Sequence, residues 1–483
     1  MGFLITLFLA IVFGALGLTR PRLGLYILIG LIISFEEMGL GFTTFRGSWV
    51  FNAFFVGFYG LRLIEVLTVS LYIPFLFTLK RLPASDRPFL MERSLAILMI
   101  IWCAMLTALE YYYTKKVEVG TWRLIVTGMM QFHLMVRLFQ SEEERKQFLK
   151  FMLIMLALRA FIGLAMYAAG FGVHSFRGRV PFFYDSVQIE AFGLGAIILW
   201  SFLLNGNSGR KEDRLFSNIV VFVMMIILLA AVVGSIRRTI WATTALGLLL
   251  VLVMSRRTTI MHYFAVLLVG AATVAAVLLA PGLDDFRSHM GKYVKSMNLF
   301  SEDQLSGNIE NEVHVNNVES YSRLLMENPD IILVGVHGPA SQNYRELIAS
   351  YSEDGSPLGL AHNGPIRSIM SFGAMGVFAY FLIYFAIIRR TFTIHNAKLD
   401  GSVLNQAAVA CGIVLFLEFS ATMLFVPPFY TSSKGLFYTF FGLFMLETAA
   451  FSIRSATKAG KLKVRYNPDG TAVQAALAAG GRP

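Results

Sequence analysis

Charged residues are scarce in this chain. They make up 15% of its 483 residues, whereas soluble globular proteins carry about 25%. Hydrophobic residues account for 56% of the chain, and the mean hydropathy is +0.64. A chain with this composition has too few polar groups to cover a surface that faces water. The composition therefore excludes a soluble globular protein and predicts one that is embedded in a membrane.

Cysteine is rare, and the chain has no recognisable cleavable leader. Cys103 and Cys411 both fall inside apolar runs, which indicates packing roles and no disulfide or metal role. The segment Met1–Leu18 is apolar but has neither a basic start nor a small-residue cleavage site. We therefore expect it to be retained as a first transmembrane helix.

Long apolar runs take the place of the missing charge. A helix needs about 20 residues to cross a bilayer, and turn-forming or charged residues separate thirteen apolar runs. We expect helices at residues 2–18, 23–35, 50–79, 94–113, 120–139, 148–170, 187–204, 216–233, 239–254, 259–280, 365–388, 404–424 and 435–451. The predicted fold class is an all-α polytopic membrane protein with about 13 transmembrane helices and one large outer loop.

Lysines and arginines in the loops set the expected orientation. Under the thirteen-helix count all basic clusters lie on one side of the membrane, and cytoplasmic loops are the ones enriched in Lys and Arg. The clusters are Arg20/Arg22, Lys80/Arg81/Arg87/Arg93, Arg145/Lys146/Lys150, Arg210/Lys211/Arg214, Arg256/Arg257, Arg389/Arg390/Lys398 and the tail from Arg454 to Arg482. Membrane orientation accounts for the net charge of +11. We therefore expect membrane lipids as partners and no nucleic acid.

The segment 281–361 differs from the other loops because it is long and acidic. It has twelve acidic and five basic residues, and it falls on the side predicted to be extracytoplasmic. Loops longer than about 15 residues without a function are uncommon. The expected domains are 1–280 with ten transmembrane helices, 281–361 as the large outer loop, 362–453 with three more helices, and 454–483 as a disordered cytoplasmic tail.

Arginines stand out on the predicted outer side. Arg237 and Arg238 occupy a tight connection between two apolar helices, and their guanidinium groups are suited to phosphate. Lipid headgroups are the alternative ligand at this position. Arg179 lies in the next outer loop toward the N-terminus, where a solvated charge is an equally good interpretation.

A further arginine, Arg323, lies in the acidic loop. Residues 319–326 have helical character, and Asn328-Pro329 is expected to end that helix. Arg323 is a candidate anion ligand, although pairing with an acidic residue one turn away is the simpler alternative. His337 follows in a Gly-Val-His-Gly stretch.

A histidine marks the point where the large loop returns to the membrane. His362 and Asn363 precede Gly364-Pro365, and proline suits the first turn of a helix. A histidine near the membrane surface can accept or pass on a proton around neutral pH. Arg367 lies one turn into the helix. Together with the outer arginines, His362 suggests group transfer from a lipid-linked diphosphate to a hydroxyl.

A metal site for the diphosphate is not expected. The chain has no Asp-x-Asp motif, and the scattered acidic residues of the loop do not resemble the carboxylate sites that bind divalent cations. We therefore predict metal-independent chemistry without a cofactor.

The surroundings of His362 fit a family pattern. His362-Asn363, nine residues, Gly373, two residues and Gly376 match a His and a small polar residue followed by a spaced Gly-x-x-Gly. This arrangement resembles the O-antigen ligase and O-antigen polymerase superfamily of bacterial inner-membrane proteins. The plan of many helices, with a large periplasmic loop ahead of the motif, is similar as well.

Other segments add to the resemblance, which spans about residues 175–380. Ser235 to Trp241 is similar to the family's Ser-Arg step at the start of a helix, with Arg238 the better match. Arg323, followed by Glu-Asn-Pro and a Gly-containing stretch, is similar to the family's loop segment. The segment after Arg179 is a looser match because it lacks the family's glycine and Pro-Asn.

The resemblance implies a multi-pass glycosyltransferase of the inner membrane with a periplasmic active site. Its donor would be an undecaprenyl-diphosphate-linked glycan, and its acceptor a glycan or lipid A–core hydroxyl. His362 would orient or deprotonate that hydroxyl. The implied ligands of the diphosphate are Arg238 and Arg323, with Arg237 and Arg179 as further candidates, and the implied supporting residues are Asn363, Arg367 and His337.

Three functions remain open from the sequence. A ligase moves a finished glycan to its acceptor, and a polymerase joins lipid-linked repeat units with the same donor chemistry; we favour the ligase. A transporter without catalysis is the third possibility. Its evidence would be the ionisable residues inside apolar runs, namely Arg62, Glu65, Arg159, Glu190 and Glu418.

Overall fold

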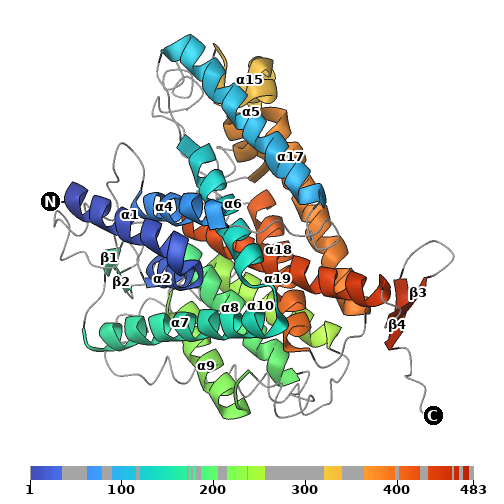
Figure 1. The fold of residues 1–483 in the computed structure, drawn as a ribbon. Coiled ribbons are helices and arrows are strands. Elements are labelled where there is room, and N and C mark those ends of the chain that lie inside the picture. The colour runs from blue at the N-terminus through green and yellow to red at the C-terminus, as the bar shows by residue number, and fades with distance from the viewer. Residues whose placement is uncertain are drawn as a thin grey trace, which may run out of the picture.

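The computed structural model is built of helices with two short hairpins (Figure 1). It describes residues 2–34, 62–78, 90–115, 120–170, 173–175, 178–180, 186–204, 215–235, 238–255, 320–339, 364–397, 402–424, 433–458, 462–466 and 472–477. The predicted helix at 259–280 and most of the large acidic loop lie outside these residues.

The helices follow the apolar runs of the sequence. Along the first half of the chain they are α1 (Gly2–Thr19), α2 (Pro21–Ser34), α4 (Leu63–Thr78), α5 (Leu90–Thr114), α6 (Gly120–Leu138), α7 (Glu142–Ala168), α8 (Ser186–Leu204), α9 (Asn218–Gly234) and α10 (Arg238–Met254). In the second half they are α15 (Pro329–Val334), the 3₁₀ turn η4 (Gly335–His337), α17 (Gly364–Asn396), α18 (Val403–Leu424) and α19 (Ser433–Lys458). Most boundaries lie within a few residues of the predicted ones.

One boundary that differs is the start of α7, which lies six residues before the predicted 148. Ser141 caps this helix: its hydroxyl accepts from the backbone N–H of Glu144 at 3.2 Å, and the Glu144 carboxylate accepts from the backbone N–H of Ser141 at 3.0 Å. This reciprocal capping box satisfies N–H groups that have no partner within the helix. The polar first turn is therefore helical although it is too hydrophilic to belong to an apolar run.

The core of the bundle is centred on α8. Every residue from 191 to 202 in this helix is buried, and α8 packs against α7, α9, α10, α18 and α19. A second dense region is aromatic, where the rings of Phe139 and Phe148 stack with centroids 4.3 Å apart. Such packing between helices provides close van der Waals contact, which holds helices together where lipid surrounds them.

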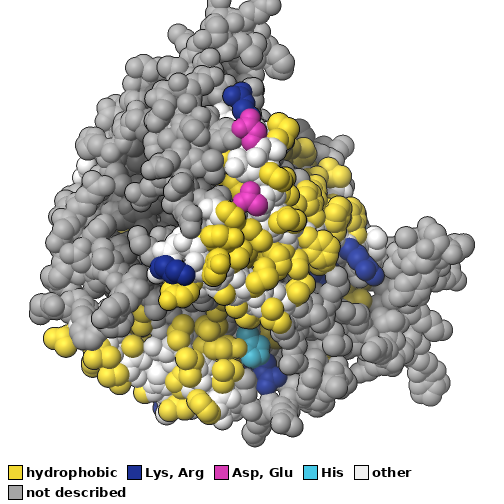
Figure 2. Space-filling model, turned by 90° about the horizontal axis from the view of Figure 1, so that it is seen from above, with side chains coloured by type: hydrophobic (Ala, Val, Ile, Leu, Met, Phe, Trp, Pro, Cys, Tyr) yellow, Lys and Arg dark blue, Asp and Glu magenta, His cyan; other side chains and the backbone are white. Residues whose placement is uncertain are grey.

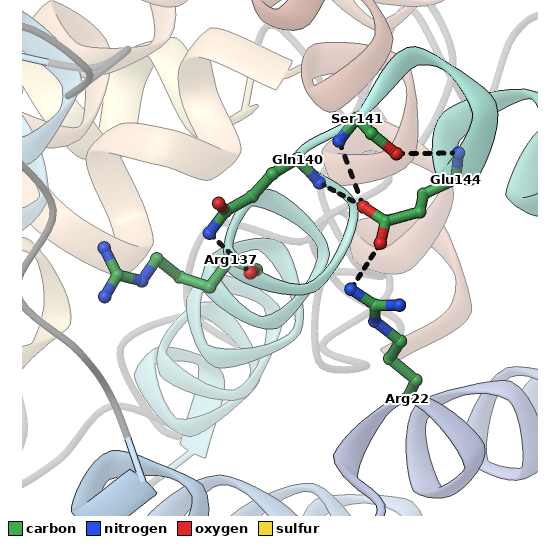
Figure 3. A network of polar contacts seen from close by, with 5 residues as sticks. All are labelled: Arg22, Arg137, Gln140, Ser141 and Glu144. Carbon is green, nitrogen blue, oxygen red and sulfur yellow. Dashed lines mark hydrogen bonds and ion pairs between the residues drawn. The ribbon is translucent and has the colours of Figure 1, made fainter.

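Polar contacts fasten one end of the bundle. Arg22, at the start of α2, pairs with Glu144, which also accepts from the backbone N–H of Gln140 at 3.0 Å (Figure 3). The α1–α2 connection and the α6–α7 turn therefore lie side by side. Both carry basic clusters that the orientation rule predicts to share one side of the membrane.

Two further contacts join the same end. Arg145 of α7 donates to the backbone carbonyl of Thr448 in α19 at 3.5 Å, and Arg390, near the end of α17, pairs with Glu447. We call the end marked by Arg22, Arg145 and Arg390 the inner end. Because α17 runs from residue 364 toward Arg390, its first turns lie toward the opposite, outer end.

Among the described residues on the face seen from above, hydrophobic side chains predominate and few charged ones lie among them (Figure 2). Among the described residues, four helical stretches are long and apolar enough to cross a membrane: Glu142–Ala168, Pro365–Asn396, Val403–Ala421 and Gly435–Ile453. Six shorter apolar helices accompany them. The predicted helical membrane protein is thus confirmed in this coarser form, whereas thirteen crossings and their orientation stay predictions.

The C-terminal residues differ from the expectation of a disordered tail. Helix α19 continues to Lys458, past the predicted end at 451. Strand β3 (Leu462–Tyr466) then pairs antiparallel with β4 (Ala472–Leu477), with Leu462 opposite Leu477. Residues 467–470 read Asn-Pro-Asp-Gly, a composition typical of turns. This turn signal between two short runs is what the compositional interpretation overlooked.

Candidate functional site

The predicted motif helix is broken at its motif glycine. Helix α17 was expected as one run over 365–388, but Gly373 has φ 62° and ψ −158°, outside the helical region. A left-handed φ with extended ψ is accessible almost only to glycine. Residues 364–372 therefore form a separate short helix ahead of the long one. The break coincides with the first glycine of the Gly-x-x-Gly pattern.

A segment of the large loop, residues 320–339, packs onto this break. Residues 320–327 are helical and end where Asn328 bonds through its side chain to the carbonyl of Leu324 at 2.9 Å, as the sequence predicted. Pro329 then starts α15, which ends at Val334, directly before Gly335, the first residue of η4. Figure 1 shows α15 beside α5 and α17 at the top of the view.

The two glycines face one another at very close range. A β-carbon on Gly335, whose φ is 68°, would lie 2.7 Å from the carbonyl oxygen of Met370 and 3.2 Å from the nitrogen of Gly373. A β-carbon on Gly373 would collide with Leu333 and lie 2.8 Å from the nitrogen of Val334. The absence of both side chains thus lets the loop backbone meet the helix backbone directly.

A small hydrophobic core of its own supports this junction. It consists of Tyr321, Leu324, Leu325, Ile331 and Met370. Four of these come from the loop segment and one from the first part of α17. The loop segment is therefore attached to α17 by buried apolar surface and does not rest on polar contacts alone.

Helix α5 contributes two polar contacts to the junction. The indole N–H of Trp102 donates to the carbonyl of Phe372 at 2.9 Å. The ring of His337 lies between two acceptors. Its Nδ1 is 2.9 Å from Oε2 of Glu110, and its Nε2 is 3.0 Å from the carbonyl oxygen of Ser371. The carbonyls of Ser371 and Phe372 are at the end of the short helix, where the helix itself supplies no donors. Trp102 and His337 supply the missing donors to these two carbonyls.

Two arginines belong to the described part of this region. Arg323 lies on the helical stretch 320–327 and is exposed. Arg367 lies in the short helix 364–372 and is partly buried, and its buried Nε atom has no hydrogen-bond partner among the residues that the structure describes. Buried donors in proteins are almost always paired. Within the described part of the chain, the Nε of Arg367 is therefore left without an acceptor.

The start of α10 carries another predicted arginine. Ser235 Oγ donates to the carbonyl of Val232 at 2.6 Å, and the indole N–H of Trp241 donates to the same oxygen at 2.8 Å. The Ser235 bond closes the end of α9, and the Trp241 bond ties that end to the first turn of α10. Arg238 is the first residue of α10, as the motif predicted, and its side chain lies outside the described residues.

The remaining predicted site residues are described only in part or not at all. His362, Asn363 and Arg237 lie outside the described residues; His362 is two positions before the start of α17 at Gly364. Arg179 lies in β2 (Gly178–Val180), opposite His174 in β1 (Val173–Ser175), and its side chain is likewise outside them. Their proposed roles stay predictions.

Glu110 and Trp102 were missed by the sequence interpretation. Both lie in α5, a helix with no matching motif and far from the loop in sequence. An acidic residue inside an apolar run is costly unless it has a partner, so Glu110 could have been singled out on that ground. Nothing in the sequence indicates that its partner is His337.

A second polar region lies inside the bundle. Glu190 of α8 and Glu418 of α18 line a cavity of about 10 Å³, together with Tyr438 of α19. That volume is about enough for one water molecule. Among the described residues, no cluster of three or more His, Cys, Asp or Glu side chains could hold a metal ion.

Comparisons with known proteins leave the family open. A scan against protein-family models finds no match, and a search of curated proteins finds no significant match. The functional conclusion therefore depends on the residues, their spacing and the geometry of the junction.

Proposed function

We propose that the chain is a membrane glycosyltransferase that moves a glycan from an undecaprenyl diphosphate carrier to an acceptor hydroxyl, in the manner of an O-antigen ligase. One observation carries the proposal: the loop segment that contains Arg323 docks on the glycine break of the helix that directly follows His362. The two motif segments are far apart in sequence. Their junction at Gly335 and Gly373 is what a single site built from both segments requires.

The distribution of charge supports a diphosphate ligand. Arg323 is exposed on the docked segment, and the buried Nε of Arg367 on the short helix has no acceptor within the described ranges. Guanidinium groups form strong, charge-assisted hydrogen bonds with phosphate oxygens. A diphosphate bound beside the junction would supply the acceptor that Arg367 lacks. Arg238 at the start of α10 is the further arginine assigned to the donor.

The chemistry of the proposed step is a direct displacement. The acceptor hydroxyl oxygen attacks the anomeric carbon of the donor, and the bond from that carbon to the diphosphate oxygen breaks. The hydroxyl proton passes to His362, and the electron pair of the broken bond leaves with the polyprenyl diphosphate. Preorganised arginines stabilise the negative charge that develops on this leaving group. No metal or cofactor takes part in this scheme.

The test is transfer in vitro by the purified full-length chain in lipid nanodiscs. A defined polyprenyl-diphosphate glycan is supplied with candidate acceptors, including lipid A–core and a second lipid-linked repeat unit. His362→Ala should lower the transfer rate about 10²- to 10⁴-fold, the usual contribution of a general base. Arg238→Ala and Arg323→Ala combined should lower it at least about 10²-fold, because they remove charge stabilisation.

A matched control separates these effects from a general loss of positive charge. Arg389 is exposed near the other end of α17, so Arg389→Ala should transfer at the wild-type rate. Transfer by His362→Ala at the wild-type rate would exclude the catalytic role. Full activity of the double arginine variant would exclude the proposed diphosphate site.

The acceptor distinguishes the ligase from the polymerase. In a deletion strain, long glycans stranded on the carrier lipid indicate a missing ligase, whereas single repeat units indicate a missing polymerase. Transport without chemistry is the third alternative, and its evidence would be the ionisable residues inside the bundle, such as Glu190 and Glu418, which line a cavity of about 10 Å³. Loss of glycan transfer in the His362→Ala variant would exclude it.

A further inference from the structure

The imidazole of His337 is held between two groups that accept hydrogen bonds. A backbone carbonyl can only accept, so the Nε2 that faces the Ser371 oxygen at 3.0 Å carries a hydrogen. The Nδ1 atom faces a carboxyl oxygen of Glu110 at 2.9 Å. Either Nδ1 carries a second hydrogen or the carboxyl group does. The pair therefore holds one proton more than a neutral imidazole beside a carboxylate.

Both partners are largely removed from solvent. The side chain of His337 is 20% exposed and that of Glu110 is 11% exposed. Without the added proton the ring has a single hydrogen, so either the Glu110 carboxylate or the Ser371 carbonyl faces the lone pair of a ring nitrogen. Either way one poorly solvated acceptor loses its hydrogen bond, which is unfavourable, so both contacts are made together only with the added proton.

Because of where the pair lies, this proton affects how the loop segment is held against α17. His337 lies near the end of the loop segment 320–339, which carries Arg323, while Ser371 is two residues before the break in α17. Helix α5 contacts the loop segment through Glu110, and it contacts α17 beside the break through the indole of Trp102. An imidazolium at the end of the short helix is also favoured by the helix dipole.

We propose that Glu110 is a positioning residue: by holding the proton of His337 it clamps the Arg323 segment onto the start of α17, and the clamp opens when that proton is lost. Closing the clamp takes up a proton, so the closed form is favoured at low pH and weakened as pH rises. The effect on catalysis rests on the proposed function, whereas the clamp itself does not.

Other charged and titratable groups lie on the elements that pack against His337. Those on described residues are Asp330 of α15, Arg367 of α17 ahead of the break, Tyr321, Arg323 and Glu327 of the stretch 320–327, and Cys103, Tyr111, Tyr112, Tyr113 and Lys115 in or directly after α5. Within the described residues, only Glu110 forms an ion pair with His337. It is therefore the group whose removal should abolish the pH dependence.

Glu110→Gln gives a sharp test because its shape is nearly unchanged. The amide of glutamine donates to the Nδ1 of a neutral His337, so the clamp no longer needs an extra proton. Amide hydrogen exchange of residues 329–337 is measured between pH 5 and 8.5 in nanodiscs, after correction for the intrinsic pH dependence of exchange. Histidine changes its charge in this range.

In the wild type, protection of residues 329–337 should fall about tenfold or more as pH rises, the worth of a hydrogen bond to a charged group. In Glu110→Gln it should stay nearly constant, and in Glu110→Ala it should be low throughout. Glu143→Gln, an exposed acid in the first turn of α7, should behave like the wild type. Two outcomes would refute the clamp: protection that does not depend on pH in the wild type, or a pH dependence in Glu110→Gln that is the same as in the wild type.

The same variants separate the clamp from the proposed function. If exchange follows the expected pattern but no acceptor receives glycan, the clamp stands and the proposed function fails. If glycan is transferred but exchange does not respond to pH, the function stands and the clamp is wrong. With both intact, the ratio of Glu110→Gln to wild-type transfer rates should rise with pH, a change that a purely structural role of Glu110 would not produce.

Discussion

Replacement of Gly373 by alanine should detach the loop segment 329–337 from α17. The added β-carbon would collide with the carbonyl of Leu333 and lie 2.8 Å from the nitrogen of Val334. These are backbone atoms, which cannot swing aside as the end of a flexible side chain can. To avoid this collision the loop backbone must move away from the helix. That movement also breaks the hydrogen bonds of His337 to Ser371 and Glu110.

The magnitude follows from two contributions. Alanine at φ 62° and ψ −158° costs about 1–3 kcal/mol in backbone strain, and forcing a methyl group into closely packed atoms costs about 1–3 kcal/mol more. Even the lower sum, about 2 kcal/mol, corresponds to about a 30-fold change in the docking equilibrium. The rest of the bundle should keep most of its stability because no residue of the loop segment is among the buried members of the main hydrophobic core, although the partly buried Val334 packs against it.

Amide hydrogen exchange in nanodiscs measures this directly. Gly373→Ala should lower the protection of residues 329–337 about 30-fold while leaving α8 protected. Gly335→Ala should reproduce the effect from the other side, because its β-carbon would lie 2.7 Å from the Met370 oxygen. Gly30→Ala is the control, since its β-carbon would meet only the end of the Met155 side chain at 3.8 Å. Unchanged protection in both junction variants would refute the docked arrangement.

Two further predictions concern the stability of the bundle in detergent, measured by thermal unfolding. Glu447→Ala should lower the free energy of unfolding by about 3–5 kcal/mol, because its side chain is 1% exposed and its removal leaves Arg390 without this partner; an unchanged melting temperature would refute this. Phe148→Ala should cost about 3–5 kcal/mol, since Phe148 is fully buried against Phe139, whereas the exposed Phe161 serves as a control that should tolerate alanine.

The helices were predictable because each one corresponds to a contiguous run of apolar residues in the sequence. Helix α1 was expected over 2–18 and is observed over Gly2–Thr19; α18 was expected over 404–424 and is observed over Val403–Leu424. The Asn328-Pro329 boundary was found for the same reason, since turn chemistry is local. The start of α7 was missed because a capping box is polar and hydropathy does not detect it.

The junction could be predicted only in part. Gly335 and Gly373 were noted as members of a pattern, but their conformations follow from a contact between segments far apart in the chain. The same holds for Glu110, whose local sequence is that of an ordinary apolar helix. The sequence identifies residues that are suited to a site, but which residues become partners depends on how the helices pack.

The two ends of α17 are fastened by different chemistry, and this difference has a consequence. At the inner end Arg390 pairs with Glu447, and arginine keeps its charge throughout the physiological pH range. At the outer end the attachment uses an indole N–H and a histidine that needs an added proton. Of these two attachments, the one at the junction should therefore respond to pH, whereas the arginine of the inner one keeps its charge. Because Arg323 belongs to the clamped segment, pH would then control whether the arginine is held beside α17.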